Sequence, residues 1–193
     1  MKTFRQFLAE ATDEKEAWFE KRTKHHIDLV KKYCRRIYEY DAKRFPKIIS
    51  QGEKHDASKY THPERLPYID ISWHYRLKDK GQKYEVTPEQ KAAMDKASTR
   101  HINNNPHHPE YHSPKEIAIN AKNRDKHIEG TPMVDATRMD DSNIAEMVAD
   151  WSAMSEEKGG TPKDWADKTV NKRWKFTPKQ VKLIYELINA IWN

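Results

Sequence analysis

The sequence predicts an all-α fold, a single helical bundle with long loops. Three segments begin with the same helix-starting pair, threonine followed by proline, at Thr87, Thr161 and Thr177. Apolar residues recur at helical spacing through several stretches, and no stretch shows the alternation of a half-buried strand. The 193 residues are enough for one domain with its own core but not for two large ones.

Caps and apolar spacing predict the helices of the N-terminal half. Asp13 with Glu16 marks the start of a first helix that runs to about residue 40, with apolar residues along one side. A further helix is expected over 64–79. Thr87 caps the next one, over 88–104, because its hydroxyl can accept an amide N–H that the helix start leaves unpaired.

The C-terminal half contains three more predicted helices. The stretch 142–157 has its apolar residues on one arc, and the glycine pair after it stops the helix. The second and third Thr-Pro starts predict helices over 162–172 and 178–192. Between the helices, three segments are expected to be loops: 50–62, 104–114 and 129–141.

Tryptophan and cysteine are expected to be packing residues. Cys34 lies in a helical stretch and, as the single cysteine of the chain, cannot form an internal disulfide. This fits a reducing compartment, and a cytoplasmic location is expected. Five of the six tryptophans are expected in the core rather than as platforms for stacking nucleobases. They are Trp73, Trp151, Trp165, Trp174 and Trp192.

Composition narrows the classes of partner. The net charge of +6 favours anionic partners, but acidic and basic residues are interleaved, so nucleic-acid binding is possible without being favoured. No apolar run approaches the roughly 20 residues that a membrane span needs, so no membrane partner is expected. With five glycines and no Gly-rich phosphate-binding motif, a P-loop ATPase or a Rossmann dehydrogenase is disfavoured.

Residues 1–12 are predicted to be a leader or flexible segment that precedes a domain over 13–193. The piece MKTFRQFLAEA is basic and amphipathic, and a packed terminal helix would explain it equally well. Leu8-Ala9-Glu10 resembles the sites that phage prohead proteases cut, after Glu10. That resemblance implies a phage protein, located in the bacterial host cytoplasm or packaged in the virion.

Histidines indicate a metal site. The stretch NPHHPEYH, over 105–112, cannot be a helix interior because of its two prolines, and it concentrates imidazoles on a loop. His55 and Asp56 are adjacent and can bind one metal if the backbone turns sharply there. His26 lies upstream on a helix, and Asp150 lies at the edge of a later apolar arc. Imidazole and carboxylate suit Mn, Fe, Co, Ni or Zn.

This order of residues resembles the HD-domain metal-dependent phosphohydrolases, which are helical proteins. The resemblance implies the metal ligands His26, His55, Asp56 and Asp150, with His25 as a competitor for the first position. A closer resemblance covers most of residues 25–176. The blocks HHIDLVKKY, HDASKY, NNPHHPEYH, EMVADWSAMS and WADKT are similar to an uncharacterised HD-like family of phages and bacteria, whose function is unknown.

HD-domain proteins with extra histidines between the His-Asp pair and the last aspartate often hold two metals, so the resemblance implies a centre with one or two divalent transition metal ions. His101, His107 and His108 are the expected added ligands, although helix capping or local hydrogen bonds would also explain some of them. Glu110 and Tyr111 are expected to orient the histidine-rich loop. His112 is the weaker candidate, and three other histidines are expected on the surface: His62, His74 and His127.

The residues around this set suggest catalytic roles. Small HD nucleotidases often have a glutamate three residues after the HD aspartate, but here that position is Lys59. Glu64 is the candidate to activate water in its place. Arg100, Lys59 and Lys54 are the cations expected to hold a phosphate or stabilise the transition state, and Tyr111 is a further candidate for substrate binding.

Three functions follow as hypotheses. The first is a metal-dependent phosphohydrolase whose substrate is a small anion, a nucleotide or another phosphoester. The second is an HD-like di-iron oxygenase, which the same ligands would support. The third is a non-enzymatic, basic protein associated with DNA or the virion, which predicts salt-dependent DNA binding that survives removal of metal.

Overall fold

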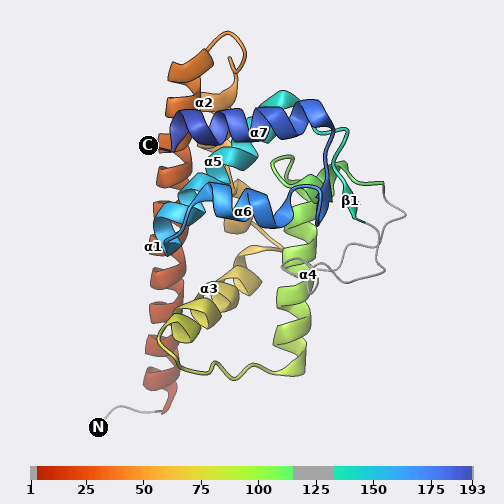
Figure 1. The fold of residues 1–193 in the computed structure, drawn as a ribbon. Helices are drawn as coiled ribbons and strands as arrows, with labels where there is room; N and C mark the ends of the chain where they lie inside the picture. The colour runs from red at the N-terminus through yellow and green to blue at the C-terminus, as the bar shows by residue number, and fades with distance from the viewer. Residues whose placement is uncertain (1–3, 115–132, 193) are drawn as a thin grey trace.

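The structure is a computed structural model that describes residues 4–114 and 133–192, with side chains from residue 12 onward (Figure 1). Within these residues it contains seven α-helices, two short 3-10 turns and one pair of two-residue strands. The prediction of an all-α single domain is therefore confirmed. No helix of the described part combines the length and apolar character that crossing a membrane requires.

The main core forms where three helices pack side by side. The long helix α1 (Phe4–Asp41) contacts α5 (Asp141–Lys158), and α7 (Pro178–Ile191) packs against both. The short helices α2 (Ile48–Lys54) and α6 (Pro162–Thr169) cover this layer. Buried apolar side chains at helical spacing hold the helices together, among them Val30, Ile37, Ile144, Val148, Ile184 and Leu187.

A second, smaller core forms beside the N-terminal half of α1. Helices α3 (Arg65–Asp79) and α4 (Pro88–Asn104) pack there, and α3 contacts both α1 and α4 (Figure 1). Its buried members are Phe19, Tyr68, Ile69 and Ala97. Along α1, His26 lies between Phe19 of this core and Val30 of the main core, so α1 carries it to the junction of the two.

The three predicted Thr-Pro helix starts are confirmed by their caps. Thr87 and Thr177 each accept the backbone N–H of the glutamine three residues later, whose side chain bonds back to the cap. Thr161 accepts from the backbone N–H of Asp164 in the same way. The helix predicted over 88–104 has those bounds, because the capping box defines its start and His101 O accepts the last amide, from Asn105.

Two helix boundaries differ from the prediction. Helix α1 begins at Phe4 instead of residue 13, so the backbone of residues 4–12 continues the helix. Cleavage after Glu10 stays a prediction, and residues 1–3 lie outside the described chain. Helix α6 ends at Thr169 instead of 172. The chain then forms β2 (Trp174–Lys175), which pairs in parallel with β1 (Val134–Asp135), although no strand was predicted.

The prediction of a loop over 50–62 is wrong in its first part, because α2 runs through residue 54. Glycine weakens helix propensity, and Gly52 made this segment look non-helical. A Cβ atom at Gly52 would lie 3.0 Å from Sγ of Cys34, so the glycine allows α2 to approach α1 closely. A 3-10 turn η1 (Ala57–Tyr60) follows, and another, η2 (Pro109–His112), lies in the predicted 104–114 loop. Residues 129–132 of the third loop lie outside the described chain.

The cysteine and the tryptophans that were predicted to be packing residues differ in how deeply they are buried. Cys34 is buried, and the indoles of Trp151 and Trp174 are buried and stacked, with ring centroids 5.7 Å apart. Trp165 and Trp192 are partly buried and pack against the main core, whereas Trp73 is partly buried and is not among the residues of either core. His62 is exposed as predicted, His74 is half-buried with its ring against Tyr75, and His127 lies outside the described residues.

Candidate metal centre

The His55-Asp56 pair sits at a sharp turn between α2 and η1. Asp56 adopts the left-handed conformation, with φ of 58°, which aspartate tolerates better than most residues. Adjacent side chains normally diverge, but this turn brings both into one place, with His55 Nε2 3.8 Å from Asp56 Oδ2. Both side chains are buried. The sharp backbone turn that His55 and Asp56 need in order to bind the same metal ion is therefore present.

Three side chains from separate elements form a first ligand group: His26, His55 and Asp150. His26 Nε2 lies 3.1 Å from Asp150 Oδ1, and 3.7 Å from Oδ2 of Asp56. His55 Nε2 lies 3.8 Å from the same Asp150 oxygen. His25 is exposed, whereas His26 is buried, which decides between the two candidates.

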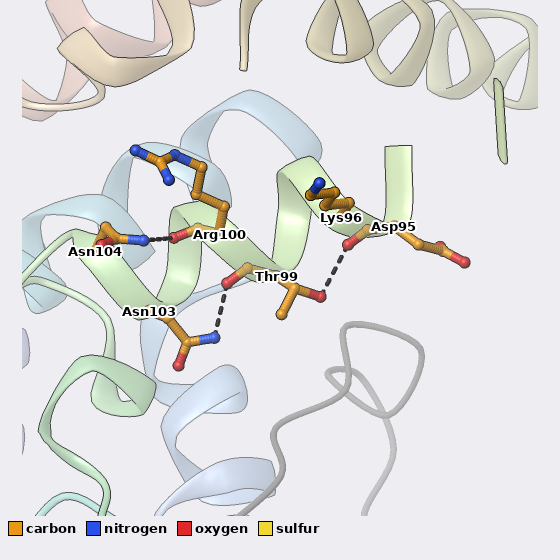
Figure 2. A pocket seen from close by; sticks show the side chains of 6 residues that line it. All are labelled: Asp95, Lys96, Thr99, Arg100, Asn103 and Asn104. Carbon is orange, nitrogen blue, oxygen red and sulfur yellow. Dashed lines mark hydrogen bonds between the residues drawn. The ribbon is translucent and has the colours of Figure 1, made fainter. Parts of the chain in front are cut away.

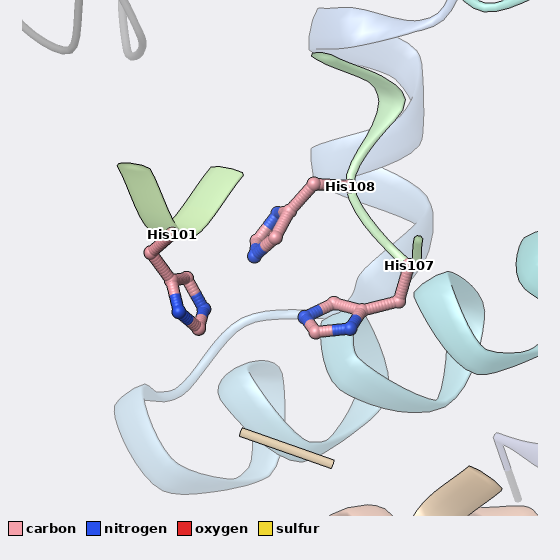
Figure 3. A group of neighbouring side chains, drawn as sticks. All are labelled: His101, His107 and His108. Carbon is pink, nitrogen blue, oxygen red and sulfur yellow. The ribbon is translucent and has the colours of Figure 1, made fainter. Parts of the chain in front are cut away.

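A second ligand group consists of His101, His107 and His108 (Figure 3). His101 projects from the last turn of α4, and the other two come from the turn that leads into η2. Ring centroids lie 5.0 Å apart for His101 and His108 and 4.2 Å apart for His107 and His108. All three imidazoles are buried, so the histidine-rich loop turns inward and is not a solvent-facing tract.

The carboxylate of Asp56 lies between the two ligand groups. Its Oδ2 atom faces the first group, as the distances to His26 and His55 show. Its Oδ1 atom faces the second group, 3.0 Å from His101 Nε2 and 3.8 Å from His107 Nε2. One carboxylate can therefore contact two cation positions, one through each oxygen.

Several candidate ligand atoms lack hydrogen bonds to one another but have the spacing of ligands around a metal ion. Buried polar atoms are normally hydrogen-bonded, yet Nε2 of His55, His101 and His107 and Oδ1 of Asp56 make no hydrogen bond. Metal–nitrogen bonds are about 2.0–2.1 Å long, so two donors on one ion lie roughly 3–4 Å apart. The separations from 3.0 to 3.8 Å between these atoms and their neighbours match that spacing.

Carboxylates approach the opposite nitrogen of the histidine rings. Glu146 Oε1 lies 2.9 Å from Nδ1 of His55 and 3.4 Å from Nδ1 of His107. Glu64 Oε2 lies 3.0 Å from Nδ1 of His101. Such partners select the tautomer that leaves Nε2 available to a metal.

A third carboxylate, Glu157, lies on the far side of the first ligand group, with Oε2 3.7 Å from His26 Nδ1. The sequence reasoning missed both Glu146 and Glu157. A usable signal existed, because both are on α5 with Asp150. Glu146 lies four residues before it and Glu157 seven after, which is helical spacing along one face.

Charge around Asp56 keeps it ionised. Burial by itself raises the pKa of this carboxyl, but Lys59 and the imidazoles of His55 and His101 outweigh burial and hold the pKa well below its ordinary value. Asp150 has a lowered pKa for similar reasons, since His26 offsets its burial. Ionised carboxylates are the form that binds cations, so both are ready to act as ligands.

The imidazoles that share Glu146 differ in their pKa. Burial opposes a proton on His55, but Asp56 and Glu146 favour it and raise the pKa of His55. The pKa of His107 is lowered, first by burial and then by the neighbouring His55. Burial also opposes the charge on Glu146, but hydrogen bonds from these two rings lower its pKa to about 2.

The residues predicted to be catalytic lie around the centre at different depths. Lys59 forms an ion pair with Oδ2 of Asp56 and is mostly buried. Glu64 is buried behind His101, where it also accepts a hydrogen bond from Ser58 at 2.8 Å. Arg100 is exposed, and its Nε atom lies 3.7 Å from Oε1 of Glu64. Lys59 is therefore the nearest of the three to the ligand atoms.

Arg100 also borders a shallow hollow of about 420 Å³ on α4 (Figure 2). The polar side chains there bond to the backbone of their own helix, as Thr99 does to Asp95 and Asn103 to Thr99. The lining comes from α4 alone and includes no member of the ligand groups. This hollow is a feature of the helix surface and is not connected to the candidate centre.

A different cavity, of about 450 Å³, reaches the ligands. His55, Asp56, His107 and Glu146 line it, and so do Lys47 and the predicted substrate contact Lys54. The remaining lining residues are mostly polar: Ser50, Gln51, Asn105, Pro106, Asp140, Ser142 and Asn143. A small polar molecule in this cavity would contact His55, Asp56 and His107.

The end of the histidine-rich loop is anchored away from the ligands. Glu110 is buried and accepts a hydrogen bond of 2.9 Å from the indole of Trp174, so it orients the loop through β2 rather than through an imidazole. Tyr111 is about half exposed, with its ring against His112. Nε2 of His112 lies 2.8 Å from the carbonyl oxygen of Pro106, which is the local hydrogen bond that was the alternative to metal binding.

Comparison with known proteins places the chain in a family. The profile of a family of unknown function, DUF5662, matches residues 15–190. No curated protein and no solved structure matches the chain.

Proposed function

Because the chain belongs to the DUF5662 family of unknown function, we propose an activity from its site: a metal-dependent hydrolase of phosphoesters, related to the HD-domain enzymes. The observation that carries the proposal is Asp56, whose two oxygens face two separate groups of buried histidines. The ligand order of the HD motif and the convergence of its four residues in space both support it.

The chemistry follows from what each side chain can do. Divalent cations bound at this centre would acidify water and offset negative charge on a phosphoryl group. The two histidine groups and Asp56 would hold the ions, and the carboxylates on the Nδ1 atoms would keep the rings turned toward them. Lys59, beside Asp56, supplies a fixed positive charge close to the reacting phosphate.

The proposed substrate is a small anion, a nucleotide or another phosphoester. The cavity that reaches His55 and Asp56 has the volume of a small-molecule site, and Lys47 and Lys54 line it. Both lysines are exposed and attract anions toward the centre. We assign them to substrate capture and Lys59 to the phosphate itself. The contacts of Glu64 favour positioning of His101 over activation of water.

Metal content and hydrolysis test the proposal together. Protein purified without chelator is expected to contain transition metal and to hydrolyse phosphoesters with added Mn²⁺, Co²⁺ or Ni²⁺. The double variant His55→Ala, Asp56→Ala should lose both properties. His25→Ala is the matched control, because that histidine is exposed and adjacent to a ligand. Equal metal content in the double variant, or no turnover in a broad phosphoester screen, would overturn the assignment.

A di-iron oxygenase is the second candidate. The mixed set of imidazoles and carboxylates around a shared Asp56 suits iron as well as it suits manganese. Oxygen separates the two candidates, because phosphoester hydrolysis proceeds without it. Turnover that stops in an anaerobic chamber and is accompanied by oxygen uptake would favour the oxygenase.

A further inference from the structure

Glu146 contacts one histidine of each ligand group. Its Oε1 atom lies at hydrogen-bond distance from Nδ1 of His55, at 2.9 Å, and 3.4 Å from Nδ1 of His107. His55 belongs to the first group and His107 to the second, and their ring centroids are 4.2 Å apart, so that with Glu146 they also lie close enough to form a ligand group of their own. A single carboxylate oxygen therefore sets the tautomer and the direction of one ligand in each group.

The other oxygen of Glu146 is held as well. Oε2 accepts a hydrogen bond of 3.2 Å from the amide nitrogen of Gln51, and the hydroxyl of Ser142 donates to the amide oxygen of the same glutamine. The side chain of Glu146 is only 8% exposed. Because both oxygens are engaged and the group is buried, the carboxylate has one preferred orientation.

The other two carboxylates of the centre differ from Glu146 in this respect. Glu64 bonds only to the second group, through His101 at 3.0 Å, and Glu157 approaches only the first, with its Oε2 atom 3.7 Å from His26 Nδ1. Two carboxylates, Glu64 and Glu157, thus each approach one ligand group, whereas Glu146 contacts a histidine of both groups. The difference can be tested without knowing the substrate.

We propose that Glu146 is the shared positioning residue of a two-cation centre, supported by Gln51, so that its loss weakens both cation positions at once. The proposal rests on the metal centre of the proposed function, but it does not require that the reaction be phosphoester hydrolysis. Losing a carboxylate partner of a metal-binding histidine typically weakens metal binding by roughly 10–100-fold. At Glu146 that loss applies to two histidines bound to two different ions.

Calorimetric titration with Mn²⁺, with metal content checked by mass spectrometry, tests the proposal in four proteins. The wild type is expected to bind two ions. Glu146→Gln should weaken both by roughly 10–100-fold. Glu64→Gln and Glu157→Gln are matched controls of the same chemistry, and each should weaken one ion and leave the other near its wild-type affinity. Far-UV circular dichroism without metal confirms that each variant is folded.

Gln51→Ala covers the case in which Glu146→Gln does not fold. It keeps the carboxylate but removes its support, and it should weaken both ions by a smaller factor. The proposal is overturned if the wild type binds only one ion, or if the Glu146 and Gln51 variants lose one ion or none. Two ions in the wild type with both weakened in Glu146→Gln, but no phosphoester turnover, would overturn the proposed reaction and leave this inference standing.

Discussion

The two ligand groups share Asp56 but are built on different kinds of structure. In the first group, His26 and Asp150 stand on α1 and α5, which pack against each other along the main core, and His55 directly follows the end of α2. The second group stands on the last turn of α4 and on a proline-containing turn, whose position depends on the anchor between Glu110 and Trp174. The packing of the main core therefore holds most of the first group in place. The second group depends on a helix end and on a turn that a buried hydrogen bond anchors.

The largest expected effect breaks both groups together. Asp56→Asn keeps the size of the side chain but removes the charge that faces both groups. We expect loss of both ions and of turnover, by more than the roughly 10–100-fold that an indirect partner contributes. Metal content and initial rates measure this. Retention of one ion at wild-type affinity would show that Asp56 serves only one group.

A narrower change separates the groups. His26→Ala removes a ligand of the first group and leaves His101, His107 and Asp56 in place, so one ion should be lost and the other retained. His25→Ala, on the exposed face of the same helix, should bind two ions as the wild type does. Titration with Mn²⁺ counts the ions. If His26→Ala lost both, the two positions would not be independent.

The anchor of the second group can be weakened without touching a ligand. Glu110→Gln removes the charge that faces the indole of Trp174 and the guanidinium of Arg173, both of which are buried. We expect stability to fall by about 1–3 kcal/mol and only the second ion to bind more weakly. Chemical denaturation measures the first effect and titration the second. Tyr111→Phe is the control, since that ring is about half exposed.

The smallest effect concerns α2, the helix that ends directly before His55. Gly52→Ala places a Cβ atom 3.0 Å from Sγ of Cys34, so the thiol or α2 must give way by a few tenths of an ångström. Overpacking of this kind costs about 1–3 kcal/mol, and thermal unfolding should report it. Adding Cys34→Ala makes room and should restore part of the loss. A double variant no more stable than Gly52→Ala would show that the contact is not the cause.

Much of the fold could be predicted because its signals are local. Thr87, Thr161 and Thr177 start helices through hydrogen bonds to residues three positions away, and such bonds need no tertiary context. Helix α2 was missed because its glycine is explained only by Cys34, which comes from another helix. Strand β2 was missed because its two residues pair with a segment far away in the chain.

The candidate site divides in a similar way. The residue types at His26, His55, Asp56 and Asp150 and in the histidine-rich loop could be selected from the sequence, because imidazole and carboxylate in such numbers need partners when buried. The choice of His26 over His25 is supported by burial, because His26 is buried and His25 is exposed. Glu146 was missed, because a glutamate on a helix face looks like any solvated charge until its two histidine partners are known.

The sequence by itself determined an all-α chain, its main helix starts and the set of side chains able to bind a metal, because caps, periodicity and residue chemistry are local properties. Only the tertiary structure decided that Asp56 lies between two histidine groups, that Glu146 serves both, and that Arg100 and Tyr111 face solvent. These outcomes depend on which helix faces pack together. That packing minimises exposed apolar surface over the whole chain, so no single segment specifies it.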